Sequence, residues 1–552
     1  MPNDPYARVR SRNVPVSERL TPDQVPNSDG AYVWALDDWA RMDRFLILGS
    51  QGGTYYIGEG DLTKENAAAV ERCIKADYKR AVDRIVEISV EGRNPKQNPL
   101  LFAYAMACGA DDMDARAYAL SKLNDICRTG TMLFVWARYV EQFRGWGRGL
   151  RNAVAKWYTE PRAQSGNFVD EDTDRGADHA HWLAYQLVKY QAREGWSHRD
   201  LLRLSKPGAP GRPKVERGSA LDRNLAWAVG KPFPDDAYDT LLQAHDEMTE
   251  AGIKPKRAAE LIEMFRVPWE AVPSEMLAKP EVWHALIPYL PMGALVRNLG
   301  RLTANGTLKP MSGVEATICS RLVNRESITR SRIHPLSVLL AATTYAAGRG
   351  VKGTLTWQPS NKVLAALDEM FNLAWPNVEP AGKRTLISLD VSGSMDSSRI
   401  ANTFLSAREA SSAMALVTLA TEPDTAVMAF SSGYIPLALH TGMSLAQIVQ
   451  STSRMPFDAT DCSLPMKWAM QKQVDVDTFV IYTDSETNRG GHPAQALRDY
   501  RQRSGIPAKL IVVAMTSNGF SIADPNDGGM LDVVGFDSAA PALIADFSAG
   551  RV

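Results

Sequence analysis

The sequence has few cysteines and no long apolar run. Its five cysteines are widely scattered, and none belongs to a C-x-x-C pair. This spacing predicts neither a zinc site nor a disulfide framework. No stretch reaches the roughly 18 apolar residues of a membrane-spanning helix. The polar segment 1–25 also lacks the apolar core of a secretory signal, so we expect a cytoplasmic protein without a membrane partner.

Motifs of common hydrolytic and phosphate-transferring enzymes are also missing. The chain has no H-E-x-x-H, no Walker A motif and no nucleophile elbow. A second acidic cluster, which a two-metal nuclease needs, is missing as well. The sequence therefore predicts that the protein is not an enzyme.

Charge is nearly balanced, with a formal net charge of −1 over 552 residues. This balance excludes a uniformly basic chain, so any nucleic-acid surface must be a local patch. One candidate is the stretch 297–352, which contains many basic residues and only two acidic ones, Glu315 and Glu326. The basic residues there are Arg297, Arg301, Lys309, Arg321, Arg325, Arg330, Arg332, Arg349 and Lys352.

The pattern along the chain divides it into an irregular arm, a helical region and an α/β region. Residues 1–29 read as the arm. Over 30–376, apolar residues recur at the helical spacing of three to four, for example from Ala67 to Val90, with turn-rich pieces between the helices. Many short helices joined by short loops favour an α-solenoid of antiparallel helix pairs.

A proline-rich linker near residue 377 marks the start of the third region, 377–552. There, apolar strands alternate with helical stretches, which predicts a doubly wound parallel α/β sheet. Ligands bind at the carboxyl ends of strands in such sheets. The predicted strands are 385–389, 425–430, 478–482, 508–514 and 531–535.

The first of these strands ends in a carboxylate and two hydroxyls at alternate positions, Asp390, Ser392 and Ser394. An extended backbone points alternate side chains the same way, so three oxygen ligands face one point. Hard oxygens of this kind suit Mg²⁺. The alternative is an aspartate that only caps the following helix.

Two later segments, Thr460-Asp461 and Thr483-Asp484, add further oxygen ligands after a loop and a strand. Together with D-x-S-x-S, they resemble the metal-ion-dependent adhesion site of von Willebrand factor A domains. The resemblance implies that a divalent cation, expected to be Mg²⁺, is a cofactor. Its implied ligands are Asp390, Ser392, Ser394, Thr460 and Asp484.

The segment 196–207 predicts one complete basic helix in the second region. Ser197 followed by Asp200 is the pattern of an N-terminal capping box. A helix start with convergent Arg and Lys is suited to phosphate, and a merely solvated basic face is the alternative. The basic residues lie at i, i+4 and i+7 on one face: Arg199, Arg203 and Lys206.

A second basic segment, 144–158, opens with glycines and continues as a helix. Its glycines do not follow a strand, so dinucleotide binding is not expected. We expect instead a helix start that contacts phosphate. Trp146 and Trp157 are expected to pack rather than to stack on bases. The core stripe is Leu150, Val154 and Trp157, and the basic residues off that stripe are Arg148, Arg151 and Lys156.

Four phrases resemble, in this order, the TROVE domain of the Ro 60 kDa autoantigen family: GWGRGLRNAVAKWY, KYQAREGWSHRDLLRLSKP, MGALVRNLGRLT and IHPLSVLLAATTYAAGRG. An A-type domain with D-x-S-x-S at the C-terminus completes that arrangement, so the resemblance covers nearly the whole chain. It implies a ring of HEAT-like repeats over 30–376 and a von Willebrand factor A domain over 377–552.

Proteins of this family bind small noncoding Y RNAs, and they bind single-stranded 3′ ends of misfolded or damaged RNAs through the central hole of the ring. The resemblance implies a ribonucleoprotein of RNA quality control or a scaffold for a ribonuclease, with polynucleotide phosphorylase as the partner in bacteria. The family's RNA contacts fall here on Arg148, Arg151, Lys156, His198, Arg199, Arg203 and Lys206. To these we add Lys189 and Arg193 as phosphate contacts.

Several alternatives stay open at this point. His198 either contacts RNA or orients the start of its helix. The acidic stretch 163–180 reads as an exposed loop that screens the basic face or selects among RNAs, and the loop 207–218 supplements binding through its basic residues. The competing functions are a cytosolic metal-dependent protein-interaction adaptor, which would purify without RNA, and a metal-dependent ribonuclease, which would consume RNA with Mg²⁺.

Overall fold

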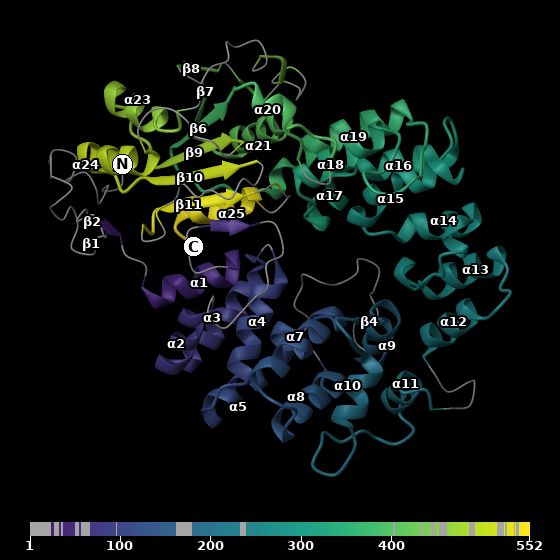
Figure 1. Cartoon of the computed structure of the whole chain (residues 1–552). Helices are drawn as coiled ribbons and strands as arrows, with labels where there is room; N and C mark the ends of the chain where they lie inside the picture. The colour runs from purple at the N-terminus through teal and green to yellow at the C-terminus, as the bar shows by residue number, and fades with distance from the viewer. Residues whose placement is uncertain are drawn as a thin grey trace. The chain divides into compact units, whose positions relative to one another are not determined.

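The chain forms two compact units in the computed structural model (Figure 1). The first unit is Met1–Ala69, Leu322–Thr354 and Asn361–Val552, and the second is Val70–Arg321 and Leu355–Ser360. Each unit therefore combines segments that are distant in sequence. The structure describes residues 24–26, 32–34, 37–49, 54–56, 67–94, 96–161, 179–231, 239–400, 403–430, 433–437, 439–441, 443, 447, 449–451, 461–484, 492–515, 524, 527–534, 536 and 540–551.

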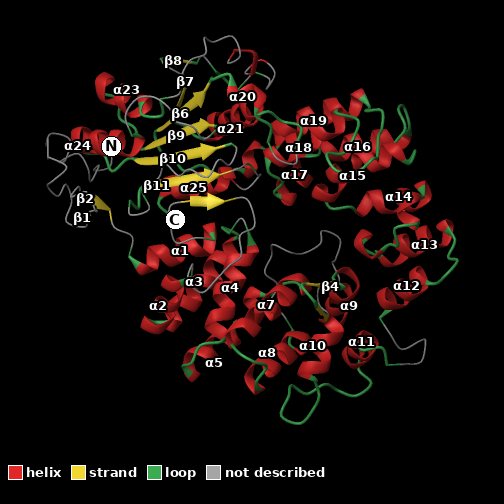
Figure 2. Ribbon diagram, viewed as in Figure 1, coloured by secondary structure: helices red, strands yellow, loops and turns green. Residues whose placement is uncertain are grey.

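The second unit is made of helices and a small hairpin (Figure 2). Its helices are α2 (Ala68–Ala76), α3 (Tyr78–Glu91), α4 (Gln97–Cys108), α5 (Met113–Ser121), α6 (Leu123–Ile126), α7 (Gly130–Phe143), α8 (Arg148–Thr159), α9 (His179–Lys189), α10 (His198–Ser205), α11 (Ala220–Ala228), α12 (Thr240–Thr249), α13 (Pro255–Phe265), α14 (Pro280–Leu286), α15 (Met292–Ala304) and α16 (Gly313–Leu322). The 3₁₀ turns are η1 (Trp269–Ala271), η2 (Met276–Ala278) and η3 (Ile287–Tyr289), and the hairpin is β4 (Ala192–Arg193) with β5 (Trp196–Ser197).

Side-chain caps decide where some of these helices begin. Asp77 is extended, with φ −154°, and its carboxylate accepts the backbone N–H of Arg80 at 3.0 Å. The helical spacing from Ala67 to Val90 is present in the structure as two helices, because Asp77 ends α2 and starts α3. Thr129 caps α7 in the same way.

The helices of the second unit pack in pairs, and several carry large aromatic side chains into the core. α4 packs against α7, and α13 packs against α14. Trp136, Trp157 and Trp283 are fully buried, and each contributes roughly 1.5–3 kcal/mol or more through burial of apolar surface. The predicted α-helical architecture of this region is confirmed.

The first unit is built on a parallel sheet with helices. In the described part of the chain its seven strands follow the order β3–β11–β10–β9–β6–β7–β8, parallel except for the edge pair β7–β8. These strands are β3 (Thr54–Tyr56), β6 (Thr385–Asp390), β7 (Thr425–Phe430), β8 (Tyr434–Pro436), β9 (Thr478–Thr483), β10 (Lys509–Ala514) and β11 (Met530–Val534). Its helices are α1 (Asp38–Leu48), α17 (Arg325–Ser331), α18 (Pro335–Ala346), α19 (Asn361–Leu373), η4 (Trp375–Asn377), α20 (Ser394–Ser397), α21 (Ala407–Thr421), α23 (Leu464–Lys472), α24 (Pro493–Ser504) and α25 (Ala540–Ala549).

The strands predicted beyond residue 377 agree with the structure to within a residue or two, and the doubly wound α/β fold is confirmed. β6 and β9 are buried along their whole length, as apolar strands in a covered parallel sheet are. They pair in parallel, with Leu389 opposite Tyr482, so Asp390 and Thr483 reach the same edge of the sheet.

One strand of the N-terminal segment, β3, joins this sheet, and two others form a separate two-stranded sheet, which the sequence pattern did not predict. β1 (Gln24–Pro26) pairs with β2 (Tyr32–Trp34), and β3 pairs in parallel with β11. The helical prediction from residue 30 was therefore wrong at β2 and β3, and residues 1–23 of the predicted arm lie outside the described residues. Within the described residues, no helix combines the length and the hydropathy needed to span a bilayer.

Candidate functional sites

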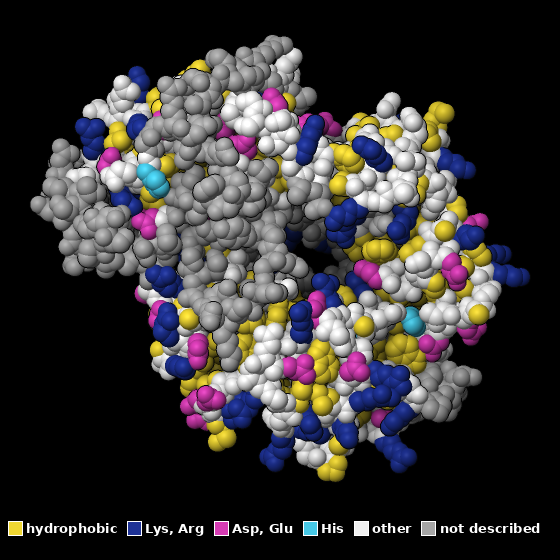
Figure 3. All heavy atoms as spheres, in the orientation of Figure 1, with side chains coloured by type: hydrophobic (Ala, Val, Ile, Leu, Met, Phe, Trp, Pro, Cys, Tyr) yellow, Lys and Arg dark blue, Asp and Glu magenta, His cyan; other side chains and the backbone are white. Residues whose placement is uncertain are grey.

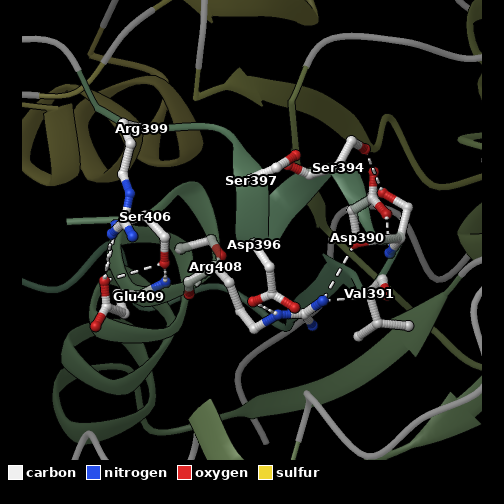
Figure 4. Close-up of polar contacts among 11 residues, drawn as sticks. Asp390, Val391, Ser394, Asp396, Ser397, Arg399, Ser406, Arg408 and Glu409 are labelled. Atoms are coloured by element: carbon white, nitrogen blue, oxygen red, sulfur yellow. Dashed lines mark hydrogen bonds and ion pairs between the residues drawn. The ribbon is translucent and has the colours of Figure 1, made fainter.

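The carboxyl ends of β6 and β9 bring carboxylates and hydroxyls together. Asp390 ends β6 and is buried, and Asp484 directly follows β9. Thr483 donates its hydroxyl to Asp390 Oδ2 at 2.8 Å, and the backbone N–H of Ser392 donates to Oδ1 at 2.8 Å. The hydroxyl oxygens of Ser392 and Ser394 lie 3.0 Å apart, in the turn drawn in Figure 4. Four of the five predicted ligands thus belong to one sheet edge, and Thr460 lies outside the described residues.

The electrostatics of this edge suit a cation. Burial raises the pKa of Asp390, and the charge of Asp484 raises it further, while hydrogen bonds from Ser392 and Thr483 lower it. A divalent cation relieves the repulsion between two carboxylates, and carboxylate and hydroxyl oxygens are the hard ligands that Mg²⁺ accepts. Among the described residues no group of three or more His, Cys, Asp or Glu gathers as metal ligands, so a cation here would depend on the serine hydroxyls.

A buried arginine holds the backbone of this turn. Arg408 on α21 is 1 % exposed, and its Nε donates to Asp396 Oδ1 at 2.6 Å (Figure 4). Its Nη2 donates to the carbonyl oxygens of Val391 at 3.3 Å and Ser392 at 3.1 Å. A capping box at Ser406 starts α21 and so fixes the helix that carries Arg408. Sequence reasoning missed this residue, because a capping pattern predicts a helix start and not the contact made across the turn.

The second candidate site lies on α8, α10 and the loop that follows α10. The predicted capping box between Ser197 and Asp200 is confirmed at the start of α10. The predicted core stripe of α8 is also confirmed, since Leu150, Val154 and Trp157 are buried. The basic residues divide by exposure: Arg148, Lys156, Arg199, Arg203 and Lys206 are exposed, and Arg151 is half-buried.

Hydrogen bonds at both ends place α8 and α10 side by side in opposite directions. The Tyr158 hydroxyl and His198 Nδ1, 2.8 Å apart, join the end of α8 to the start of α10. Arg212 Nη1 donates to the carbonyl oxygen of Arg148 at 3.0 Å and so joins the following loop to the start of α8. Figure 3 shows Lys and Arg side chains gathered over these elements and α11. We call Arg148, Arg151, Lys156, Arg199, Arg203, Lys206 and Arg212 the α8–α10 surface.

His198 differs from its basic neighbours because it is buried, with 4 % of its surface exposed. Its Nε2 lies 3.2 Å from the carbonyl oxygen of Gln186, so Nε2–H donates there while Nδ1 accepts from Tyr158. Burial lowers the pKa of His198 to about 4, and the ring is therefore neutral at pH 7. With both ring nitrogens bound inside the protein, the geometry favours orientation of α10 over direct contact with RNA.

The neutral state of His198 makes stability sensitive to acid. Histidine titrates near pH 6.5 in unfolded chains, so between about pH 6.5 and 4 the unfolded state binds more protons than the native state. The titration of His198 therefore leaves the free energy of unfolding unchanged above pH 6.5 and lowers it by up to about 3 kcal/mol as the pH drops toward 4. We expect urea unfolding at pH 7.5, 6 and 5 to show a smaller loss in His198→Gln than in wild type. His334, whose pKa burial also lowers to about 4, contributes equally in both proteins; equal losses would contradict the assignment.

The two contacts added from sequence differ in the structure. Lys189 is half-buried; its Nζ donates to the Tyr185 hydroxyl at 2.8 Å and lies 5.0 Å from the centroid of that ring. Arg193 is exposed on β4, in the hairpin that precedes α10. Arg193 is therefore the better placed of the two to meet a phosphate from solvent.

Two carboxylates near the α8–α10 surface are engaged, Asp200 by the cap of its own helix and Glu160 by Lys156 of the surface itself. Asp200 accepts the backbone N–H of Ser197 at 3.1 Å, and Glu160 Oε1 lies 3.3 Å from Lys156 Nζ. The predicted acidic loop 163–180 lies outside the described residues as far as residue 178. The other basic stretch, 297–352, is divided between the two units, and Arg321 is engaged by the carbonyl oxygen of Leu290 at 2.7 Å.

Family models match both parts of the chain. The model described as the TROVE domain matches residues 25–268 and 222–344, and the Ro60 vWA domain matches residues 384–548. The chain thus has the two domains of a TROVE protein that carries a von Willebrand factor A domain.

Individual relatives agree over almost the full length. A protein of Deinococcus radiodurans named RNA-binding protein RO60 is 38 % identical over 550 residues, which cover 99 % of each chain. One of the same name from Caenorhabditis elegans is 33 % identical over 97 % of this chain and 91 % of its own. The crystal structure of the Deinococcus radiodurans RO (RSR) protein superposes with a TM-score of 0.83 at 37 % identity, over 94 % of this chain and 100 % of that one. The chain belongs to the Ro60 family.

Proposed function

We propose that this protein binds RNA through the α8–α10 surface. The observation that carries the proposal is the convergence of exposed Arg and Lys side chains from two antiparallel helices, beside carboxylates that are already hydrogen-bonded or ion-paired. Such a surface neutralises several phosphates of one RNA at once and releases their counterions. The relatives named RNA-binding proteins support the same function.

The RNA that fits this proposal is structured and has single-stranded ends. A rigid basic surface on packed helices suits the fixed phosphate spacing of a folded small RNA, such as a Y RNA. Single strands bind through phosphates and through stacking of their bases on aromatic side chains. We propose a cytoplasmic ribonucleoprotein that acts in RNA quality control or as a scaffold for an exoribonuclease such as polynucleotide phosphorylase, and that does not itself cleave RNA.

A gel-shift series tests this function. The purified protein is mixed with a structured RNA, with and without a single-stranded 3′ tail, at salt concentrations from about 50 to 300 mM. Binding that weakens steeply with salt supports the surface, and a further gain from the tail supports capture of RNA ends. Failure to bind either RNA at low salt would reject the proposal in favour of a protein-interaction adaptor. Loss of RNA on addition of Mg²⁺ would instead support a ribonuclease.

We also propose that the β6–β9 edge binds Mg²⁺ through Asp390, Ser392, Ser394 and Asp484. The support is the pair of buried carboxylates and the neighbouring serine hydroxyls. In von Willebrand factor A domains such a cation leaves a position for a carboxylate of a partner protein, and the two carboxylates and two serine hydroxyls described at this edge are ligand types of that kind. The edge would then serve protein partners while the α8–α10 surface serves RNA.

Calorimetry with Mg²⁺ tests the metal proposal. We expect wild-type protein to release or absorb heat on titration and to gain thermal stability, because the cation binds the native state only. Asp390→Ala should show neither effect, since a buried ligand is lost. Asp499→Ala, which removes a carboxylate on α24, is the matched control and should behave as wild type. Equal heats of Mg²⁺ titration from wild type and Asp390→Ala would contradict the proposal.

A further inference from the structure

The hairpin that leads into α10 sets an indole beside a guanidinium. β4 and β5 are joined by Glu194 and Gly195, both with positive φ, at 56° and 81°. This is the two-residue turn that matches the twist of a hairpin. Arg193 and Trp196 are directly opposite each other across the strands, so their side chains project from the same face.

A second indole meets the first from another element. Trp146 lies between α7 and α8, and its ring centroid is 5.3 Å from that of Trp196, with the rings inclined at 57°. The indole N–H of Trp146 donates to Glu141 Oε1 at 3.0 Å, and buried Trp136 packs edge-on at 6.1 Å. β4 and β5 both pack against α7, near which Figure 1 draws β4. Both indoles of this pair are held in place and remain partly exposed. Trp146, which was expected to pack rather than to stack on bases, therefore packs but also keeps surface open to a ligand, whereas Trp157 is fully buried.

The surroundings of the two indoles are basic. Arg144 and Arg148 are exposed on either side of Trp146 in the chain, and Arg193 is exposed beside Trp196. The carboxylate at the hairpin tip, Glu194, is paired with Arg138. Large aromatic rings left partly in water between arginines suit a ligand that has a flat face and carries negative charge.

We propose that Trp146 and Trp196, together with Arg193, form a stacking site for an unpaired base of a single-stranded RNA segment. This inference rests on the proposed RNA-binding function and extends it to a named subsite. The indole faces take the base, and Arg193 takes the adjoining phosphate. Because β5 leads directly into α10, the site lies at the border of the α8–α10 surface. A single strand that leaves a structured RNA bound there would pass over it.

The test compares intact and abasic RNA on the full chain. An abasic nucleotide keeps the phosphate charge and removes the stacking face, so it separates stacking from electrostatics. The probes are a labelled single-stranded 12-mer, the same strand with abasic sites, and a fully paired RNA hairpin. Trp196→Ala is expected to lower the affinity for the intact strand roughly tenfold or more and to leave the affinity for paired RNA unchanged. Trp196→Phe, which keeps an aromatic face, should recover most of the affinity.

Two controls separate this inference from the function on which it rests. Trp227→Ala removes another partly exposed indole, which donates to Asp246 on α12, and should leave all three probes bound as in wild type. Arg199→Ala/Arg203→Ala should lower the affinity for intact, abasic and paired RNA alike. The stacking site is overturned, and the RNA-binding surface stands, if the double variant lowers the affinity for all three probes but Trp196→Ala lowers it for none. The same conclusion follows if wild type binds the abasic and intact strands with equal affinity. If neither variant affects any probe, both fail.

Discussion

Replacing both Arg199 and Arg203 by alanine is expected to weaken binding of structured RNA by roughly 30-fold at physiological salt. Both side chains are exposed on one face of α10, four residues apart, and under the proposed function each binds one phosphate. Each lost contact removes on the order of 1 kcal/mol at such an exposed site. The slope of log affinity against log salt should also become shallower by about 1.4–1.8, because each neutralised phosphate contributes about 0.7–0.9. Filter binding across a salt series measures both quantities.

A matched control removes two positive charges elsewhere on the second unit. Lys75 and Arg80 are exposed on α2 and α3, and Lys75→Ala/Arg80→Ala changes the net charge equally. Its affinity and salt slope should remain close to those of wild type. If both double variants lose affinity equally, the attraction is a property of the net charge and not of the α8–α10 surface.

Loss of the buried carboxylate of Asp527 is expected to destabilise the first unit by about 3–5 kcal/mol. Asp527 is fully buried and pairs with Arg501, whose side chain is 4 % exposed. Asp527→Ala leaves that guanidinium charged and uncompensated in the interior. Arg44 lies at the same turn, where it donates to the carbonyl oxygen of Gly528 at 2.8 Å, so the substitution also weakens the attachment of α1.

Urea unfolding, with hydrogen exchange of β10 and β11 as a local measure, checks this result. Glu71→Ala is the matched control, since its pair with Lys75 is exposed, and we expect a change below about 1 kcal/mol. A loss from Asp527→Ala no larger than that of the control would contradict the role of the buried pair.

Local patterns predicted the features that depend on neighbours in the chain. The capping box at Ser197 and Asp200 needs residues three apart, and it is present in the structure. The strands from residue 385 onward need only an apolar run between polar turns. The placement of Asp390 and Asp484 at one sheet edge follows from the rule that parallel strands end together.

Features that depend on distant residues could not be predicted. β3 has three residues, and only its pairing with β11 makes it a strand. The sequence left open whether His198 contacts RNA or orients the start of α10, because its partners Tyr158 and Gln186, which take it into the core, lie 40 and 12 residues away in the chain. Arg408 belongs to the turn after β6 only because α21 folds back onto that turn. In each case the deciding contact has no short-range signal.

The pairing of β3 with β11 also orders events during synthesis. The residues of β3 leave the ribosome among the first, and those of β11 follow about 480 residues later. At ~5–20 residues per second this interval is roughly 25–95 s. Until it has passed, the N-terminal segment has no partner strand, although the helices between the two strands can fold. A protein stopped short of β11, or one started after β3, therefore leaves an open sheet edge of the kind that draws other chains into aggregates.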